Sequence, residues 1–223
     1  MEGWKLVGLF KWTTFDVRSL MPGDWDEKLI EAARRLNRRK RIMPPHLTSR
    51  EAPDVRELVI RGVSASVVEA ELPWVQELYE TLFLQLAQLT TNEPVSVAKG
   101  KRHTIVLNVQ ASEDMRYECH VDTNPIQGLL YVTSQPPGMG GELIISNNTA
   151  AASLEEIDAD CSTIYPQSGY LVFFDGRYNP HYIRPLLKDG DIRVAVAMNY
   201  YIPSVPESLR PPDLDDYLFG TVL

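Results

Sequence analysis

Cysteine and long apolar runs are scarce in this chain, and each shortage argues against a class of protein. The 223 residues include only two cysteines, Cys119 and Cys161, which points to a reducing compartment rather than to a disulfide framework. No apolar run is long enough to span a membrane, and no apolar signal segment stands at the start. We therefore expect a soluble, cytoplasmic protein.

Positive charge is also in short supply. Lysine and arginine together number 22 against 30 aspartates and glutamates, so the formal net charge is −8. Such a chain repels phosphate at long range, which disfavours binding to nucleic acid or to an anionic membrane. We expect a small-molecule partner, with no nucleic acid and no membrane, and a chain that acts as a monomer or homodimer.

The first part of the chain, residues 1–94, is predicted to be a helical support. Residues 24–41 begin with Asp24 as a candidate N-cap and carry apolar residues at helical spacing before a basic run. We interpret that run as a solvated helix end rather than as a phosphate-binding site, because basic residues there complement the helix dipole. A second apolar stripe, over about residues 70–90, predicts a helix that packs on the core.

Short apolar strands separated by turns occupy residues 95–203. This series predicts an antiparallel barrel or sandwich with the helices packed outside, in one α+β, mainly β domain over residues 1–223. The proline-rich tail, residues 204–223, is predicted to run extended before a short terminal turn. It can pack on the core, shield a site or contact a second subunit, and ordinary packing is the simplest of these.

The segment YECHVDTNP, residues 117–125, places a histidine and an aspartate one residue apart in a chain with only four histidines. Alternation along a strand sends Glu118, His120 and Asp122 to one side. His181, after YLVFFDGRYNP, can supply a further ligand. Two histidines and one carboxylate on one face of a metal are typical of non-haem Fe(II) oxygenases. A lone H-x-D pair is a weak signal, since chance and strand-end hydrogen bonds also produce it.

Arg193 strengthens this interpretation. It begins the apolar strand RVAVAMNYY, where a buried arginine requires an anion. A dicarboxylic co-substrate would supply one, because the guanidinium group binds a carboxylate through two parallel hydrogen bonds.

Four segments, in this order, resemble the successive motifs of the Fe(II)- and 2-oxoglutarate-dependent oxygenases, in particular the prolyl-hydroxylase-like branch. They are HVDTNPIQGLLYVTS, GGELIISNN, YPQSGYLVFFDGRYNPHYIRP and GDIRVAVAMNYY, and the resemblance covers about residues 95–203. It implies a double-stranded β-helix, a jelly-roll or cupin-like barrel with the iron at its open end. It also implies that an unactivated C–H bond is hydroxylated with O2, while 2-oxoglutarate is converted to succinate and carbon dioxide.

Carried over residue by residue, the resemblance implies three iron ligands: His120, Asp122 and His181. Arg193 would anchor the distal carboxylate of 2-oxoglutarate, and Tyr131 falls where this branch has a tyrosine that hydrogen-bonds the same carboxylate. Gln110 stands where prolyl hydroxylases often carry another co-substrate tyrosine. Gln110 and the nearby Asn108 are therefore only candidate co-substrate contacts.

The aspartate of this ligand set bears on the outcome of the reaction. Related radical halogenases have a small residue in its place, so the presence of Asp122 favours hydroxylation, or another oxidative outcome such as desaturation, over halogenation. The chain is also similar to bacterial oxygenases of free amino acids, including the lysine hydroxylase and halogenase group. A free amino acid or a natural-product intermediate is the expected substrate.

Residues that match substrate positions of those oxygenases are Tyr117 and Asn199. Glu118 is predicted to share a strand face with His120, where it can meet an ammonium or guanidinium group of a cationic amino acid. A carboxylate in water at a strand edge is an equal alternative for Glu118. The weaker substrate candidates are His103, Thr123 and Tyr201.

Three functions remain open from the sequence. The leading one is a small-molecule hydroxylase, and the second is a peptidyl or prolyl hydroxylase, which needs an exposed groove beside the iron. The third is a non-catalytic metal-binding sensor module, which the presence of a full set of iron and co-substrate residues disfavours.

Overall fold

The computed structural model of this protein describes residues 12–43, 47–51, 57–100, 102–112, 116–219 and 221–222. The larger of its two sheets has nine strands: β1 (Trp12–Asp16), β2 (Arg38–Ile42), β3 (Leu58–Val63), β4 (Ser96–Val97), β5 (Ile105–Ala111), β6 (Ile126–Tyr131), β9 (Tyr170–Phe174), β11 (Ile192–Tyr201) and β12 (Thr221–Val222). The smaller sheet has three strands: β7 (Leu143–Ser146), β8 (Cys161–Ile164) and β10 (His181–Ile183).

Neighbouring strands in both sheets run antiparallel. The larger sheet has the order β1-β9-β6-β11-β5-β3-β2-β12, with β4 also paired to β11, and the smaller sheet has the order β10-β7-β8. The predicted antiparallel architecture is therefore confirmed. Sequence neighbours such as β5 and β6 are separated by β11, so residues distant in the chain are brought side by side.

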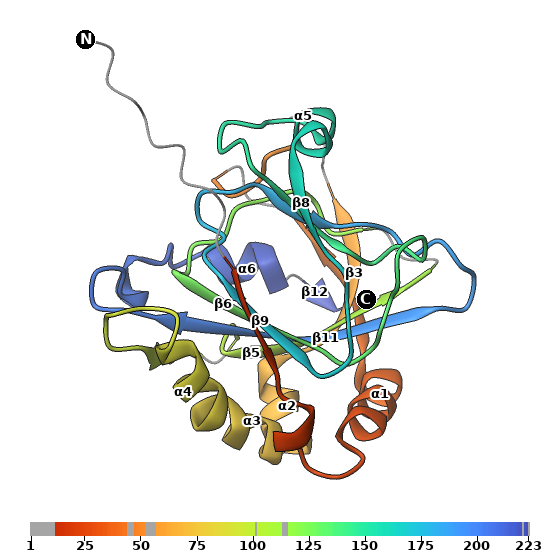
Figure 1. Cartoon of the computed structure of the whole chain (residues 1–223), viewed down its shortest axis with the longest axis vertical. Coiled ribbons are helices and arrows are strands. Elements are labelled where there is room, and N and C mark those ends of the chain that lie inside the picture. The colour runs from red at the N-terminus through yellow and green to blue at the C-terminus, as the bar shows by residue number, and fades with distance from the viewer. Residues whose placement is uncertain are drawn as a thin grey trace.

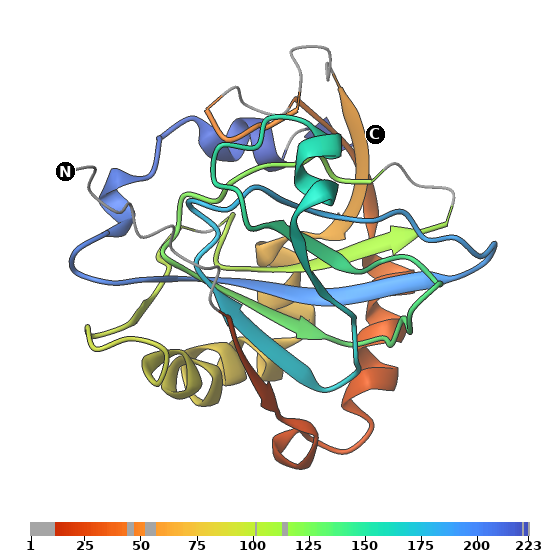
Figure 2. The same cartoon turned by 45° about the horizontal axis from the view of Figure 1, so that its top comes forward.

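The helices lie mainly on one side of the larger sheet. They are α1 (Trp25–Leu36), α2 (Ala65–Glu71), α3 (Pro73–Glu80), α4 (Leu82–Gln88), α5 (Leu154–Ala159) and α6 (Leu214–Phe219), with 3-10 turns η1 (Arg18–Leu20) and η2 (Glu207–Leu209). Figure 1 shows α1 to α4 below the larger sheet and β8 and α5 on its other side, and the turned view in Figure 2 agrees. Among the described residues, no helix is both long and apolar enough to cross a membrane.

Strand alternation separates the packed core from the space between the sheets. Along β11, Val194 and Val196 pack in the apolar core between the larger sheet and the helices, whereas Ala195 packs with Leu143 and Ile145 of the smaller sheet. Successive side chains of a strand point to opposite faces, so each central strand gives one face to the helix layer. The other face lines the space between the two sheets.

The region before residue 94 contributes strands as well as helices, because β1, β2 and β3 all join the larger sheet. The basic run that we placed at the end of a helix is divided: Arg34 and Arg35 lie in the last turn of α1, as expected, whereas its remaining basic residues belong to β2, where that interpretation is wrong. The helix ends earlier, at Leu36, where the side-chain amide of Asn37 donates to the carbonyl oxygens of Ala33 and Arg34 at 2.7 and 3.0 Å. These bonds satisfy carbonyls that have no partner within the helix.

The single helix predicted over residues 70–90 is three short helices, α2, α3 and α4. Pro73 is at the start of α3, where its missing N–H is harmless but prevents α2 from continuing. Thr81, with φ −120° and ψ −89°, separates α3 from α4. Leu89, expected on the buried stripe, is 72% exposed. Asp24 precedes α1 as expected, but its side chain makes no capping hydrogen bond.

The C-terminal tail is folded, so the prediction of an extended segment with a terminal turn is wrong. It contains η2 and α6 and returns to the larger sheet as β12, which pairs with β2. Helix α6 also packs against β2. The first turn of α6 carries Asp215 and Asp216, and carboxylates there favour helix formation through the helix dipole.

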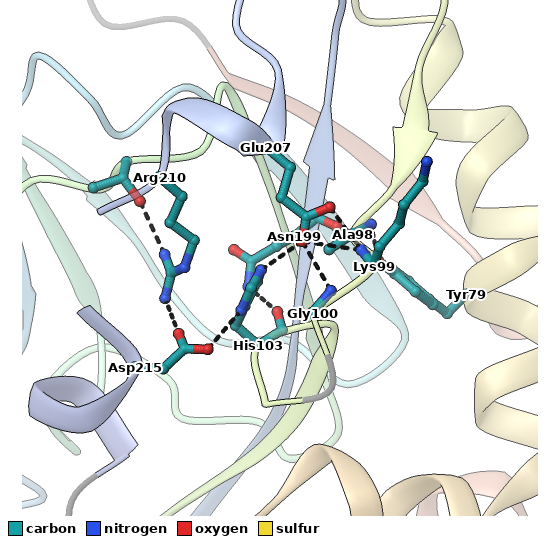
Figure 3. A network of polar contacts seen from close by, with 10 residues as sticks. Tyr79, Ala98, Lys99, Gly100, His103, Asn199, Glu207, Arg210 and Asp215 are labelled. Atoms are coloured by element: carbon teal, nitrogen blue, oxygen red, sulfur yellow. Dashed lines mark hydrogen bonds and ion pairs between the residues drawn. The ribbon is translucent and has the colours of Figure 1, made fainter. Parts of the chain in front are cut away.

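Tyr79 joins the helix layer to the larger sheet. Its hydroxyl donates to the carbonyl oxygen of Asn199 at 2.7 Å and accepts from the backbone N–H of Ala98 at 2.8 Å (Figure 3). Burial is the main reason why the pKa of this hydroxyl is raised, so it stays a neutral donor.

We predict that Tyr79→Phe lowers the free energy of unfolding by about 1–2 kcal/mol, because it removes a buried hydroxyl from two backbone partners. Urea unfolding followed by circular dichroism measures the change. Tyr165→Phe is the matched control, since Tyr165 is 44% exposed. Equal stability of the two variants would contradict the role given to Tyr79.

Candidate metal centre

His120 and His181 face each other across an isolated antiparallel bridge. The N–H of His120 donates to the carbonyl oxygen of His181 at 3.0 Å, and the N–H of His181 donates back to His120 at 2.9 Å. His181 begins β10, whereas His120 lies in the connection between β5 and β6. We had expected a strand there, but this connection forms no continuous strand. Side chains of directly opposed residues lie on the same side, which brings the two imidazole centroids to 4.6 Å.

Both imidazoles present a bare nitrogen to the same point. Nδ1 of His120 lies 2.9 Å from the carbonyl oxygen of Glu118, and Nδ1 of His181 lies 3.0 Å from that of Asn179. A carbonyl oxygen only accepts, so each Nδ1 carries the proton and each Nε2 keeps a free lone pair. This is how metal-binding histidines are oriented in proteins. Burial, and secondarily the neighbouring His181, lowers the pKa of His120, which favours the neutral ligand form.

Asp122 completes the group. Its Oδ1 lies 3.8 Å from Nε2 of His120, and its Oδ2 lies 3.5 Å from Nε2 of His181. One ligand atom from each of the three residues lies within 4.8 Å of the others. Oδ2 is buried and has no hydrogen-bond partner. Two neutral imidazole nitrogens and a buried carboxylate oxygen without a partner fit a divalent metal ion.

Gly176 makes room for this carboxylate, and sequence reasoning missed it. A Cβ at this position would lie 2.3 Å from Oδ2 of Asp122 and 2.8 Å from Cε1 of His181. Its carbonyl oxygen accepts from the N–H of Asp122 at 3.0 Å. The one available signal was a glycine five residues before His181 in FFDGRYNPH, which is common turn chemistry and does not by itself indicate a close approach.

The ligand group lies in a cavity of about 250 Å³ between the two sheets. The inner faces of β5 and β11 line it, through side chains such as Asn108, Gln110 and Arg193. The predicted site residues that line this cavity are His103, Asn108, Gln110, Tyr117, His120, Asp122, Thr123, His181, Arg193 and Asn199. Three predicted site residues, Glu118, Tyr131 and Tyr201, do not line it.

Arg193 is a buried cation that the protein leaves unpaired among its described residues. Its side chain is in the same cavity, the residue is 3% exposed, and neither Nε nor Nη2 has a hydrogen-bond partner. Burial lowers its pKa. Its Cζ lies 5.4 Å from the ring centre of Tyr131, whose buried hydroxyl is bonded to no carboxylate or backbone group among the described residues. Buried donors without partners are costly, so this pair is ready to receive an anion.

Gln110 and Asn108 lie on the cavity side of β5, next to Arg193 in the sheet. Gln110 pairs with Arg193 in the register of β5 and β11, and Asn108 pairs with Ala195. The amide nitrogen of Gln110 donates to the carbonyl oxygen of Arg184 at 3.2 Å, whereas its Oε1 has no partner. Gln110 therefore keeps one acceptor for a bound molecule.

The position of Glu118 contradicts both alternatives offered from the sequence, a contact with a cationic substrate group and a carboxylate in water. It is 1% exposed, so it is not a carboxylate in water, and it does not line the cavity. Its Oε2 accepts from the hydroxyl of Ser49 at 2.6 Å, and burial raises its pKa. The reason is the missing strand: without regular alternation, Glu118 does not follow His120 and Asp122 into the cavity.

The weaker substrate candidates have separate outcomes. Tyr201 lines a surface hollow near Pro206 instead of the metal cavity. His103 lies in the cavity wall but is hydrogen-bonded to two tail carboxylates, Glu207 and Asp215. The side-chain amide of Asn199 donates to the carbonyl oxygen of His103.

Sequence reasoning also missed several residues of the cavity wall, namely Lys40, Arg61, Arg210 and Leu214. The basic run around Lys40 was visible in the sequence, but we had assigned it to a helix surface. The tail residues carried no motif, and only their packing reveals them.

Comparison with known proteins gives a likeness in structure. No protein-family model matches the chain, and no curated protein matches its sequence. Similar solved structures include the non-heme alpha-ketoglutarate-dependent epimerase SnoN from nogalamycin biosynthesis, with 12% identity and a TM-score of 0.59 over 96% of this chain and 87% of that chain.

Two further structures extend the likeness. A 2OG-Fe(II) oxygenase family oxidoreductase from Burkholderia pseudomallei has 10% identity and a TM-score of 0.56 over 85% of this chain and 84% of that chain. HygX from Streptomyces hygroscopicus, solved with iron bound, has 13% identity and a TM-score of 0.55 over 87% and 83% of the two chains. The chain therefore has the double-stranded β-helix fold of the 2-oxoglutarate and Fe(II) oxygenases, as predicted.

We predict that Gly176→Ala weakens metal binding by about tenfold to a hundredfold, because the added methyl group displaces a ligand oxygen. Anaerobic titration with Fe(II), or with Co(II) followed by absorption, measures the affinity. Gly23→Ala is the matched control, since nothing lies within 4 Å of a Cβ there. Unchanged metal affinity in a folded Gly176→Ala variant would show that the carboxylate does not need this space.

Proposed function

We propose that this protein is an Fe(II)- and 2-oxoglutarate-dependent oxygenase that hydroxylates an unactivated C–H bond of a small molecule, with release of succinate and carbon dioxide. The observation that carries the proposal is one cavity with two complementary features. It contains two imidazoles and a carboxylate with ligand atoms within 4.8 Å, and it contains the unpaired guanidinium group of Arg193.

The ligand set supports iron. Two histidines and one carboxylate leave coordination positions open, which suits a metal that must also bind a chelating co-substrate and oxygen. His120, Asp122 and His181 would hold the ion, and the bound iron and co-substrate would supply the oxidising chemistry. The protein's own part is to keep both imidazoles in the ligand tautomer, through the carbonyls of Glu118 and Asn179, and to leave space for the carboxylate at Gly176.

Arg193 and Tyr131 support 2-oxoglutarate as the co-substrate. A buried guanidinium group beside a buried hydroxyl, neither bonded to a carboxylate among the described residues, suits the distal carboxylate of a dicarboxylic acid. HygX, whose fold is similar, has been solved with nickel and 2-oxoglutarate bound. Gln110, with its partly satisfied side-chain amide, and Asn108 are proposed to lie beside the co-substrate.

The C-terminal tail forms part of the cavity wall, and this wall favours a small-molecule substrate over a peptide substrate. Arg210 and Leu214, both from the C-terminal tail, line the cavity together with residues of β2 and β3. A peptide hydroxylase needs an open groove beside the metal, whereas the folded tail forms part of the wall of this cavity. Tyr117, Thr123 and Asn199 are the proposed substrate contacts, because they line the same cavity as the ligands.

We predict that replacing any one of His120, Asp122 or His181 with alanine abolishes succinate formation from 2-oxoglutarate while the fold is retained. Each change removes a metal ligand from a cavity rather than a side chain from the apolar core. Succinate and product mass are measured across a panel of amino acids and peptides, and a gain of one oxygen atom identifies hydroxylation. Asp189→Ala, at an exposed carboxylate, is the control.

Retained turnover in any of the three ligand variants would refute the assignment. Metal binding without succinate formation in the unmodified protein would instead favour a sensor module. Oxygen transfer to peptides but not to free small molecules would favour a peptidyl hydroxylase.

We predict that Arg193→Lys raises the KM for 2-oxoglutarate by about tenfold or more, because lysine keeps the charge but loses the planar pair of donors. The KM for the oxidised substrate should change much less. Steady-state kinetics with each compound varied in turn separates the two effects. A change confined to the KM of the oxidised substrate would make Arg193 a substrate residue.

A further inference from the structure

We infer that the substrate carries an oxyanion group, such as a carboxylate or a phosphate ester, and that Lys40 and Arg210 bind it under the C-terminal tail. The inference rests on the proposed function and names the class of substrate for the same cavity. It concerns a second anion, distinct from the co-substrate carboxylate assigned to Arg193.

The cavity wall has the opposite charge balance to the whole chain. Its described lining residues include four lysines and arginines, Lys40, Arg61, Arg193 and Arg210, whereas Asp122 is the single acidic residue among them. The whole chain has 22 basic and 30 acidic residues. With Asp122 assigned to the metal and Arg193 to the co-substrate, the remaining charged residues among the described lining, Lys40, Arg61 and Arg210, are all basic. Charge of one sign in a concave site concentrates ligands of the other sign.

Arg210 is held in a defined position beside the metal centre. Its side chain is 9% exposed, and its Nη1 donates to the hydroxyl of Thr123 at 3.0 Å. Thr123 follows the proposed ligand Asp122 directly in the chain. Nη2 of Arg210 pairs with Asp215, which leaves other N–H donors of the guanidinium group for a ligand. A planar donor group fixed at two points is suited to binding an oxyanion.

Asp215 contacts both Arg210 and His103, so it fixes the position of the guanidinium group from one side only. Its Oδ2 lies 3.0 Å from Nδ1 of His103, and Nε2 of the same ring lies 2.9 Å from Oε1 of Glu207. Figure 3 shows Arg210, Asp215, His103 and Glu207 linked in one chain of contacts. Although burial raises the pKa of Asp215, hydrogen bonds from His103 and Arg210 lower it to about 2, so this carboxylate stays charged.

The same contacts fix the tail as a wall of the cavity. Glu207 accepts from the backbone N–H groups of Lys99 and Gly100, with distances of 2.8 to 3.0 Å. Neither Glu207 nor Asp215 lines the cavity, whereas Arg210 and Leu214 do. The tail therefore turns its carboxylates toward His103 and presents a cation and an apolar side chain to the substrate.

Lys40 provides a second cation on a neighbouring element. It is 7% exposed, which is rare for lysine, and it lies on β2, where it pairs in register with Val222 of β12. Burial, and secondarily Arg102, lowers the pKa of Lys40. A bound oxyanion would favour its charged form and relieve the repulsion from Arg102.

This inference changes the expected mode of amino-acid recognition. The sequence suggested that Glu118 receives a cationic group, but Glu118 lies outside the cavity and bonds to Ser49. A free amino acid would fit this site through its carboxylate, with its ammonium group directed elsewhere.

The test uses the holoenzyme with Fe(II) and 2-oxoglutarate and a panel of matched compounds. Each small carboxylic acid or phosphate monoester is compared with its methyl ester, amide or amine analogue. Succinate formed above the background without a substrate is one measurement. Calorimetric binding to the anaerobic Ni(II) and 2-oxoglutarate complex is the second. We expect the anionic member of an active pair to be preferred by about tenfold or more in both.

Variants assign the preference to the named residues. Lys40→Gln and Arg210→Gln should each reduce the preference by about tenfold, and the conservative Lys40→Arg and Arg210→Lys should restore part of it. Arg34→Gln, at an exposed position of α1, is the control with unchanged preference. Circular dichroism and the affinity for 2-oxoglutarate test whether each variant is folded.

The outcomes separate this inference from the proposed function. Background succinate formation with no preference for the anionic member, or with a preference for the amine, overturns the inference and leaves the oxygenase assignment intact. A preference that persists in both glutamine variants also overturns it. No succinate formation under any condition refutes the oxygenase assignment and the inference with it. Preference for carboxylates over phosphates, or the reverse, supports the inference and identifies the oxyanion.

Discussion

The backbone pair between His120 and His181 is the contact on which the rest of the site depends. Two reciprocal hydrogen bonds tie the connection that precedes β6 to the first residue of β10, and so tie the larger sheet to the smaller one. Directly opposed residues share a face, so both imidazoles must converge. Asp122 then needs only its own backbone bond to Gly176 to reach the same point. A slip of one residue in this pairing would turn an imidazole away, so the metal site depends on backbone register.

The site also depends on the difference between the two faces of the larger sheet, one apolar and one polar. On the helix side, alternate residues such as Val194, Val196 and Met198 are almost completely buried in an apolar core. That core supplies the stability which allows the opposite face to hold polar groups at a cost. Arg193 is the clearest case, because it is charged, buried and without a carboxylate partner among the described residues. A bound dicarboxylic acid would offset this cost, so the burial of Arg193 favours binding of such an acid.

Much of this site could be predicted from the sequence, and the omissions share one physical cause. The short spacing of His120 and Asp122 is visible in a linear pattern although they lie in no continuous strand. Arg193 is visible because it belongs to an apolar strand, where alternation fixes the direction of its side chain. Gly176 could not be found in this way, because its importance comes from a contact with a side chain far away in sequence. The basic segment at β2 was misassigned since the helix stops at Asn37 through a local side-chain bond that periodicity does not reveal. The predicted roles of Tyr131 and Asn108 stay predictions, supported by their positions.

Residues near the end of the chain form part of the cavity wall. Arg210 and Leu214 line the cavity, yet neither belongs to the sheets that hold the metal ligands. Their position comes from His103, which is 5% exposed and lies between the carboxylates of Glu207 and Asp215. Glu207 and Asp215 do not line the cavity, so the metal ligands and the tail wall can each form without competing for the same carboxylates.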